Sequence, residues 1–146
     1  MALFQAFNIS ASGMTAERFR TDIIAENVAN VNTTRTEDGT PYRRKIVTFA
    51  EKDTPAFGDY LSRARVYGGN GVRVTKVLED NESDYIMDYD PSHPDADENG
   101  YVSYPNVNIV SEMTNLIDDS RGYEANVTAF NAIKSMAQAG LQVGKS

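Results

Sequence analysis

The sequence predicts an α+β fold, in which long N- and C-terminal helices pair as a coiled coil and flank a small β-rich middle domain. The main observation is that residues 107–142 carry apolar side chains at alternating spacings of three and four, which keep one stripe of a helix against a partner helix. Residues 3–31 carry a looser version of this repeat. Between these segments, short runs of β-forming residues alternate with turn residues, a pattern typical of strands.

The N-terminal segment is expected to be helical to about Val31. A polar run at residues 30–34 then competes for backbone hydrogen bonds and ends the helix. The small residues Ser10, Ser12 and Gly13 weaken this helix, and they also let a neighbouring helix approach closely. The apolar side chains expected at an interface are Leu3, Phe7, Met14, Ile24 and Val28.

The middle of the chain is expected to hold strands at residues 42–49, 72–77, 85–89 and 101–104. The basic cluster at residues 43–45 is too small for a nucleic-acid site, so a solvated strand face is expected there. Residues 53–59 are expected to form a loop. The glycine-rich run at residues 68–71 precedes a strand rather than a helix, which favours a hairpin turn over a phosphate-binding loop.

The C-terminal helix is expected to start at Asn106 or Asn108, both of which are good N-cap residues. If it runs over residues 108–142, it is roughly 50 Å long at about 1.5 Å per residue. A small middle domain cannot cover a helix of that length, so the N-terminal helix, other subunits, or both must bury its apolar stripe. The stripe residues expected at an interface are Met113, Leu116, Tyr123, Val127, Phe130 and Leu141.

These elements divide the chain into a helix at residues 1–35, a β-rich domain at 36–106 and a helix at 107–146. The formal net charge of −7 is concentrated in the middle. The two ends hold seven of the 21 acids and six of the 14 bases, so the middle keeps 14 acids against eight bases. Nearly neutral helices suit close packing of many like copies, and an acidic middle argues against nucleic acid or an anionic membrane as a partner.

The absence of Cys excludes disulfides and thiolate chemistry. No run of residues approaches the ~18 apolar residues that a membrane-spanning helix needs, so no membrane insertion is expected. The N-terminus has neither a basic n-region nor an apolar block of roughly 7–15 residues. A cleaved secretion signal of the usual kind is therefore not expected.

Residues 95–101 match the first half of a calcium-binding loop. Asp95, Asp97 and Asn99 would supply oxygen ligands at alternate positions, and Gly100 follows where such a loop turns sharply. The match fails at the position of the bidentate Glu, which Asn106 occupies, and no amphipathic helix precedes the loop. A small calcium-binding module is therefore the alternative hypothesis, and a polar turn leading into a strand is favoured.

No catalytic constellation is found, and no cofactor is expected. His93 is the only histidine, and among the acids of its loop a role in the turn is favoured over general-base chemistry. The adjacent carboxylates Asp118 and Asp119 diverge by about 100° on a helix, so they do not share one site. An enzyme acting on periplasmic glycan would need an acid/base pair, and the sequence presents none. The chain is therefore expected not to be an enzyme.

Two stretches, at residues 9–16 and 25–33, resemble the signature of the bacterial flagellar axial (rod and hook) proteins. Glu26 stands at a position where that family has Asn. Motifs at residues 41–44, 90–94, 100–108 and 120–126 resemble the proximal-rod member of the family, whose short length also fits. At the position of Gly122 that member more often has Ala.

The resemblance implies a structural subunit of the proximal rod that polymerises through its terminal helices. These helices would form a coiled-coil layer lining the inner tube, with the β-rich middle outside it. The implied partners are further copies of the chain, other rod proteins, and the inner-membrane (MS) ring with its adaptor protein. The subunit would transmit torque from that ring to the distal rod and hook.

The resemblance also implies a location in the flagellar basal body, in the rod that spans the periplasm. Export would proceed through the flagellar type III apparatus, which needs no cleaved signal. The apolar residues named above would then form the interface between subunits. A purified monomer is expected to have largely disordered ends, because single marginal helices lack partners.

Overall fold

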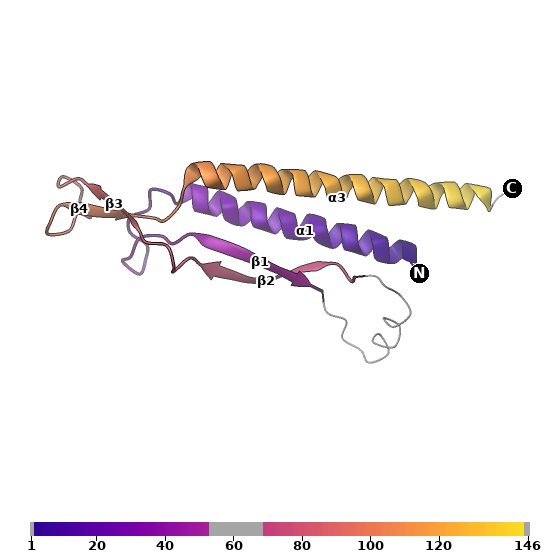
Figure 1. Cartoon of the computed structure of the whole chain (residues 1–146), viewed down its shortest axis with the longest axis horizontal. Helices are drawn as coiled ribbons and strands as arrows, with labels where there is room; N and C mark the ends of the chain where they lie inside the picture. The colour runs from indigo at the N-terminus through magenta and orange to yellow at the C-terminus, as the bar shows by residue number, and fades with distance from the viewer. Residues whose placement is uncertain (1, 53–68, 145–146) are drawn as a thin grey trace, which may run out of the picture. The chain divides into compact units, whose positions relative to one another are not determined.

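The computed structural model describes residues 2–52 and 69–144 (Figure 1). The helices α1 (Ala2–Ala29) and α3 (Ile109–Val143) begin and end this described chain. The strands between them in sequence are β1 (Lys45–Glu51), β2 (Val72–Glu79), β3 (Ile86–Tyr89) and β4 (Tyr101–Tyr104). The long helices pack together and the strands form small sheets, so the predicted α+β fold is confirmed. The predicted loop at residues 53–59, and Gly68 of the glycine-rich run, lie outside the described residues.

The chain forms two compact units. The first unit comprises residues 1–19, 49–75 and 119–146, and the second unit comprises residues 20–48 and 76–118. Each unit contains part of both helices and part of β1 and β2, whereas β3 and β4 belong to the second unit. The predicted division into helix, middle domain and helix follows the order of elements along the chain, and as a division into domains it stays a prediction.

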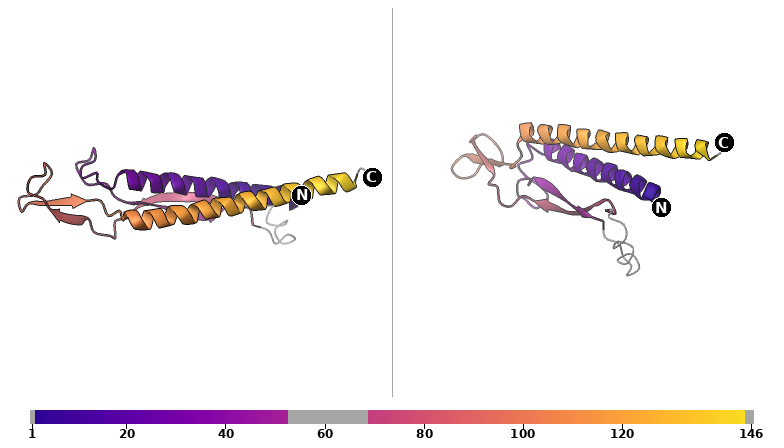
Figure 2. Two further views of the ribbon diagram at one scale, coloured as in Figure 1. Left: turned by 90° about the horizontal axis from the view of Figure 1, so that it is seen from above. Right: turned by 45° about the vertical axis from the view of Figure 1, so that its right-hand side comes forward.

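Strands β1 and β2 pair with each other and form one two-stranded sheet. At one end of the pair, Lys52 N donates to Gly71 O at 2.9 Å. At the other end, Asp80 N donates to Arg44 O at 2.8 Å, so the two strands run antiparallel. The right-hand view of Figure 2 shows the two strands side by side.

Strands β3 and β4 form a second, antiparallel sheet in which Ile86 lies opposite Tyr104 and Tyr89 opposite Tyr101. The turn before β4 ends at Gly100, whose φ of +83° is a conformation that glycine adopts readily. A Cβ at this position would lie 3.0 Å from the Tyr89 ring. The hairpin therefore requires glycine there for two reasons, backbone conformation and space.

The strand and helix boundaries follow the sequence closely, with one informative difference. Strand β4 has the predicted bounds, and α3 starts after Asn108, whose Oδ1 accepts from Ser111 N at 3.1 Å as an N-cap. Strand β1 begins at Lys45, three residues later than predicted. The reason is that the N–H of Arg44 donates to Asn106 Oδ1 at 2.9 Å and is therefore not available to the strand ladder.

The two units bury different kinds of side chain. In the second unit, Ile24, Val102 and Val107 are 5%, 0% and 2% exposed and form an apolar core. In the first unit, the buried positions on the helices include Ala16, Ser10 and Asp119, which are small or polar. Asp119 is 2% exposed and its neighbour Asp118 is exposed, so the two carboxylates diverge as predicted.

Neither helix, over the residues described, has a stretch that is both long and apolar enough for a membrane span.

Candidate subunit interface

A buried polar network holds the second unit together around Asn27, which is 1% exposed. Its Nδ2 donates to Lys45 O at 2.9 Å and to Glu112 Oε2 at 3.0 Å. Its Oδ1 accepts from Lys45 N at 2.8 Å and from the Tyr42 hydroxyl at 2.9 Å. Every donor and acceptor of this buried amide therefore has a partner, and one side chain joins α1, β1 and α3.

Glu112 carries the buried negative charge of this network and is 0% exposed. Its Oε1 accepts from Arg44 Nε at 2.8 Å and lies 2.7 Å from Arg44 Nη2. Asn106 holds the arginine in place, because its Oδ1 accepts from Arg44 N and its Nδ2 donates to Asp80 O at 2.9 Å. A buried carboxylate needs both a counter-charge and hydrogen bonds, and Arg44 and Asn27 supply them.

The hydroxyl of Tyr42 is held in its protonated form by the same surroundings. Burial raises its pKa above the usual value near 10, and the negative charges of Glu26 and Glu112 add to the effect. The protonated hydroxyl is a donor, which is what the Oδ1 of Asn27 requires.

The solvated strand face predicted for the basic cluster at residues 43–45 is wrong, because all three bases are partly buried and each has a partner. Arg43 donates to Asp80 O at 2.9 Å, and its guanidinium lies 4.2 Å from the centre of the Tyr85 ring. Lys45 pairs with Glu26 of α1, and the remaining arginine pairs with the buried glutamate of α3. Acids distant in sequence neutralise two of the three bases, and no local pattern reveals these partners.

In the first unit, small side chains let α1 and α3 approach closely. A Cβ placed on Gly13 would lie 2.6 Å from Asn126 Oδ1, and one placed on Gly122 would lie 3.1 Å from Glu17 Oε1. Asn126 Nδ2 donates to Gly122 O at 2.9 Å, which fixes the amide in this seam. The prediction that small residues of the first helix admit a neighbouring helix is confirmed, and that neighbour is α3 of the same chain.

The contacts between the helices in the first unit define an antiparallel register. Phe7 packs edge-on against Phe130 with ring centroids 4.8 Å apart. In this contact and in the two glycine contacts, the numbers of the two facing residues add up to between 137 and 139, as expected for antiparallel helices. Because α1 begins at Ala2, the register places no α1 residue opposite α3 beyond about residue 136.

The last eight residues of α3, 136–143, are therefore named the α3 overhang. Met136 and Leu141 are 63% and 70% exposed. No charged residue occurs in residues 135–144, and the last turn of the helix has no base to interact with its carbonyl groups. The overhang is thus an apolar, uncharged helix end that faces solvent.

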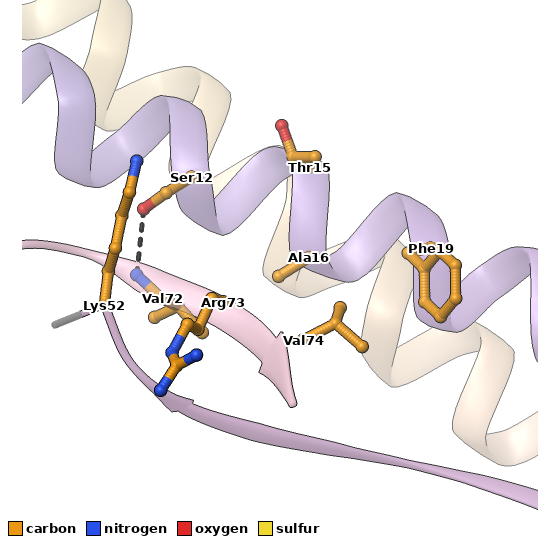
Figure 3. Close-up of a pocket in the computed structure, with 8 residues that line it drawn as sticks. All are labelled: Ser12, Thr15, Ala16, Phe19, Lys52, Val72, Arg73 and Val74. Atoms are coloured by element: carbon orange, nitrogen blue, oxygen red, sulfur yellow. Dashed lines mark hydrogen bonds between the residues drawn. The ribbon is translucent and has the colours of Figure 1, made fainter. Parts of the chain in front are cut away.

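A groove of about 350 Å³ lies between α1 and the start of β2 in the first unit (Figure 3). Ser12 Oγ accepts from Val72 N at 3.0 Å, the bond drawn dashed in Figure 3, while Phe19 and Val74 supply apolar lining. Gly71 has a φ of +96°, and a Cβ there would lie 2.2 Å from Ser12 Oγ. The last glycine of the glycine-rich run therefore lets β2 approach the helix.

The residues predicted for the subunit interface lie in three settings. Ile24 is buried within the second unit. The partly buried members are Phe7, Met14, Val28, Leu116, Val127 and Phe130. The exposed members are Leu3, Met113, Tyr123 and Leu141, at 37%, 55%, 41% and 70%. These exposed side chains are accessible to another subunit, and their role in an interface stays a prediction.

Sequence reasoning missed an exposed apolar face at the start of α3. Val110 and Ile117 are 74% and 53% exposed, and they share one helix face with Met113 at a spacing of three and four residues. The predicted stripe does not include them, because it runs through Ile109 and Leu116, each one residue earlier in the sequence. A search for a second 3–4 spacing through Met113 would have found this face.

In the loop considered for calcium binding, the carboxylates of Asp95 and Asp97 already bind other groups of the protein. Asp95 pairs with Arg35 at 2.6 Å. Asp97 Oδ1 accepts from Asn99 N and Tyr101 N, both at 2.8 Å. Among the residues that the structure describes, no group of three acidic, His or Cys side chains is placed to hold a metal ion. The calcium alternative gains no support from this geometry.

His93 takes the structural role in the turn that the sequence favoured. Its Nδ1 accepts from Asp95 N at 3.1 Å, and its ring lies 6.4 Å from that of Tyr104. Nearby, the hydroxyl and the N–H of Ser92 donate to Asp90 and lower the pKa of that carboxyl. The turn therefore carries ionised acid at neutral pH.

Comparison with known proteins finds matches along nearly the whole chain. The family model described as "Flagella basal body rod protein" matches residues 7–35, and the one described as "Flagellar basal body rod FlgEFG protein C-terminal" matches residues 98–143. The chain is 44% identical to the flagellar basal-body rod protein FlgC of Bacillus subtilis, over 99% of this chain and 100% of that protein. It is 44% identical to FlgC of Borreliella burgdorferi, over 98% of each chain. With FlgC of Salmonella typhimurium it shares 37% identity, over 99% of this chain and 100% of that protein.

Proposed function

The chain belongs to the flagellar basal-body rod protein family and is a structural subunit of the rod, and from this premise we propose that it polymerises through the apolar surfaces of its terminal helices. Each Å² of apolar surface that is buried between subunits contributes roughly 25 cal/mol to assembly. Two different patches meet in each contact, and such heterologous contacts repeat from copy to copy to build a helical assembly.

The observation that carries this proposal is the α3 overhang. It is apolar and uncharged, and Met136 and Leu141 are more than half exposed. A helix on the surface of a soluble protein normally presents charged side chains to water. An uncharged apolar helix end suits burial against another subunit instead.

The exposed face at the start of α3 supports the same proposal. Val110, Met113 and Ile117 form a continuous apolar strip on the part of the helix that belongs to the second unit. Helix–helix contacts use such strips at spacings of three and four residues. The overhang and this strip lie within residues 98–143, the range that matches the C-terminal rod family model.

The partners and location follow from the rod family. In this proposal, the subunit packs against further copies of itself and other rod proteins, and at the base of the rod against the MS ring and its adaptor protein. It reaches the rod that spans the periplasm through the flagellar type III apparatus, and it transmits torque to the distal rod and hook. It acts by packing and catalyses no reaction.

The experiment tests the overhang with a single added charge. The Leu141→Asp chain is produced in a flagellated strain that lacks the native chain, and motility and isolated basal bodies are examined. A charge at a subunit contact costs several kcal/mol when buried without a partner. We expect loss of motility and basal bodies that stop at the inner-membrane ring.

The matched control is Asn131→Asp, which adds the same charge at an exposed position of the same helix with almost no change in shape. This variant should support motility. Normal motility with Leu141→Asp would refute assembly through the overhang. Loss of motility with both variants would show that added charge, rather than its position, disturbs the rod.

A further inference from the structure

One face of the β3–β4 hairpin is an exposed apolar surface. The register places Met87 opposite Ser103 and Tyr89 opposite Tyr101, and directly opposed side chains point to the same face of a hairpin. Met87, Tyr89 and Tyr101 are 54%, 62% and 44% exposed. The two tyrosine rings meet edge-on, with centroids 5.2 Å apart. These four residues are named the hairpin platform.

The buried residue of the hairpin strands lies on the opposite face. Val102, which is opposite Asp88 on that face, is 0% exposed. The platform is therefore not part of the core. A two-stranded hairpin is marginally stable in water by itself, and clustered aromatic side chains that face solvent are typical of interaction sites.

The platform belongs to an acidic part of the chain. Residues 79–98, which include Met87 and Tyr89, contain nine acids and no Lys or Arg, and among the described residues only Asp95 of these nine forms a salt bridge, with Arg35. Glu98 is exposed and lies in the turn that joins the tyrosine end of the two strands. A partner that fits this surface must bring positive charge beside apolar side chains, because acids and aromatic faces both attract cations.

The chain itself presents such a surface on β2. Lys76 is exposed and forms no salt bridge in the part of the chain that the structure describes. Leu78, two residues further along β2, points to the same face of the strand as Lys76 and is 47% exposed. Lys76 and Leu78 are named the β2 patch.

We propose that the hairpin platform of one subunit docks on the β2 patch of a second copy of this chain. Tyr89 and Tyr101 pack against Leu78, and Lys76 faces the acids of the hairpin turn. The two surfaces are different, so the contact is heterologous and repeats from copy to copy. The inference rests on the proposed function, since the rod is what brings copies together, and it adds a contact outside the helices.

The first test uses disulfide formation, for which the cysteine-free chain gives no background. Chains with Met87→Cys and with Leu78→Cys are produced together in a strain that lacks the native chain, and the rods are oxidised. We expect a disulfide-linked dimer only when both variants are present. The control pairs Leu78→Cys with Glu37→Cys, an exposed position outside the hairpin, and should give no dimer.

The outcome separates the docking contact from the proposed function. Motile cells whose rods show no more dimer with Met87→Cys than with the Glu37→Cys control would overturn the docking contact and leave assembly through the helices intact. If the cysteine chains do not assemble, the charge exchange described next decides the question.

The second test exchanges the charges across the contact. Glu98→Lys and Lys76→Glu should each lower the number of subunits retained in isolated rods several-fold, because each places like charges in contact. A chain with both changes carries one exchanged charge on each surface, so every contact again joins opposite charges and retention should recover. A double variant no better than Glu98→Lys alone would overturn a second copy as the partner and would point to a different basic subunit.

Discussion

The two units of this chain are stabilised by different chemistry. The second unit has an apolar core and a buried ion pair, Arg44–Glu112, joined to an amide whose hydrogen bonds are all made. The first unit joins its helices through glycines and the Phe7–Phe130 pair, and it leaves apolar side chains of α3 exposed. A unit whose polar groups are satisfied internally can fold alone, whereas one with exposed apolar surface gains stability when a partner covers it.

This difference assigns separate tasks to the two units. The second unit fixes where α1, β1 and α3 meet, and its buried polar groups specify one arrangement of these elements. The first unit depends more on other subunits for its stability, because its helices meet through glycines and one ring pair, whereas the second unit presents its exposed strip at Val110, Met113 and Ile117 from a frame that is already held together. Variants that disturb one unit and spare the other therefore test the comparison directly.

The largest effect is expected from Glu112→Ala in the second unit. This change leaves Arg44 without its buried counter-charge and Asn27 without an acceptor, which costs about 3 kcal/mol of unfolding free energy. Urea denaturation of the purified chain, followed by circular dichroism, measures the loss. Glu124→Ala, which removes an exposed acid from the same helix, should change stability by less than about 0.5 kcal/mol. Equal losses in the two variants would show that the network does not stabilise this unit.

A smaller loss of stability but a strong effect on assembly is expected from Phe130→Asp in the first unit. The change removes the contact with the Phe7 ring and places a charge between helices, at a cost of about 2 kcal/mol. The strain should lose motility, while the urea midpoint of the second unit stays unchanged. Tyr123→Asp, at a more exposed position of the same helix, should act in the same direction. Normal motility with Phe130→Asp would contradict this division of tasks.

The two glycines of the helix seam should respond differently to Ala. In Gly13→Ala the new methyl group meets the fixed amide of Asn126, and overpacking of this kind costs about 1 kcal/mol net of the better helix propensity. In Gly122→Ala it meets only the flexible end of Glu17, so the change should be neutral or slightly stabilising. Thermal unfolding, followed by the helical signal in circular dichroism, ranks the stability of the variants. Asn126→Ala should rescue Gly13→Ala, and the reverse ranking would refute the close approach.

The smallest expected effect is a dependence of folding stability on pH through Tyr42. Because its pKa is raised in the fold, the folded chain keeps a proton that the unfolded chain loses near pH 10. Stability is therefore fully present below pH 10 and falls as the pH rises above it. Tyr42→Phe should cost about 1 kcal/mol at pH 7 through the lost hydrogen bond to Asn27, and its stability should decline less above pH 10. An alkaline decline as steep as that of the native chain would assign it to another group.

The order and type of the elements could be predicted because they depend on local signals. The bounds of β4 and the N-cap at Asn108 follow from β-forming residues and from a side chain that accepts from the first turn. The identity of the buried residues could not be predicted in the same way. Glu112 and Asp119 are buried while Ile109 and Met113 are exposed, so a rule that places apolar residues inside selects the wrong side of α3 near its start.

Composition and periodicity could not predict the polar network, because its members are far apart in sequence. Asn27 and Glu112, for example, are separated by 85 positions. The motifs that resemble the rod family nevertheless contain Asn27, Tyr42, Arg44 and Asn106, all members of this network. Nothing in the sequence explained why these residues occur at these positions. The structure explains it, because their side chains satisfy one another's hydrogen bonds.

Hydrogen exchange measures most directly whether the first unit depends on assembly. The experiment compares the purified, dilute chain with isolated rods, peptide by peptide. We predict that the amides of residues 119–143 exchange rapidly in the dilute chain and are protected in rods, while those around Asn27 and Glu112 are protected in both. Strong protection of residues 119–143 in the dilute monomer would contradict the claim that this end of the helix is ordered by its neighbours.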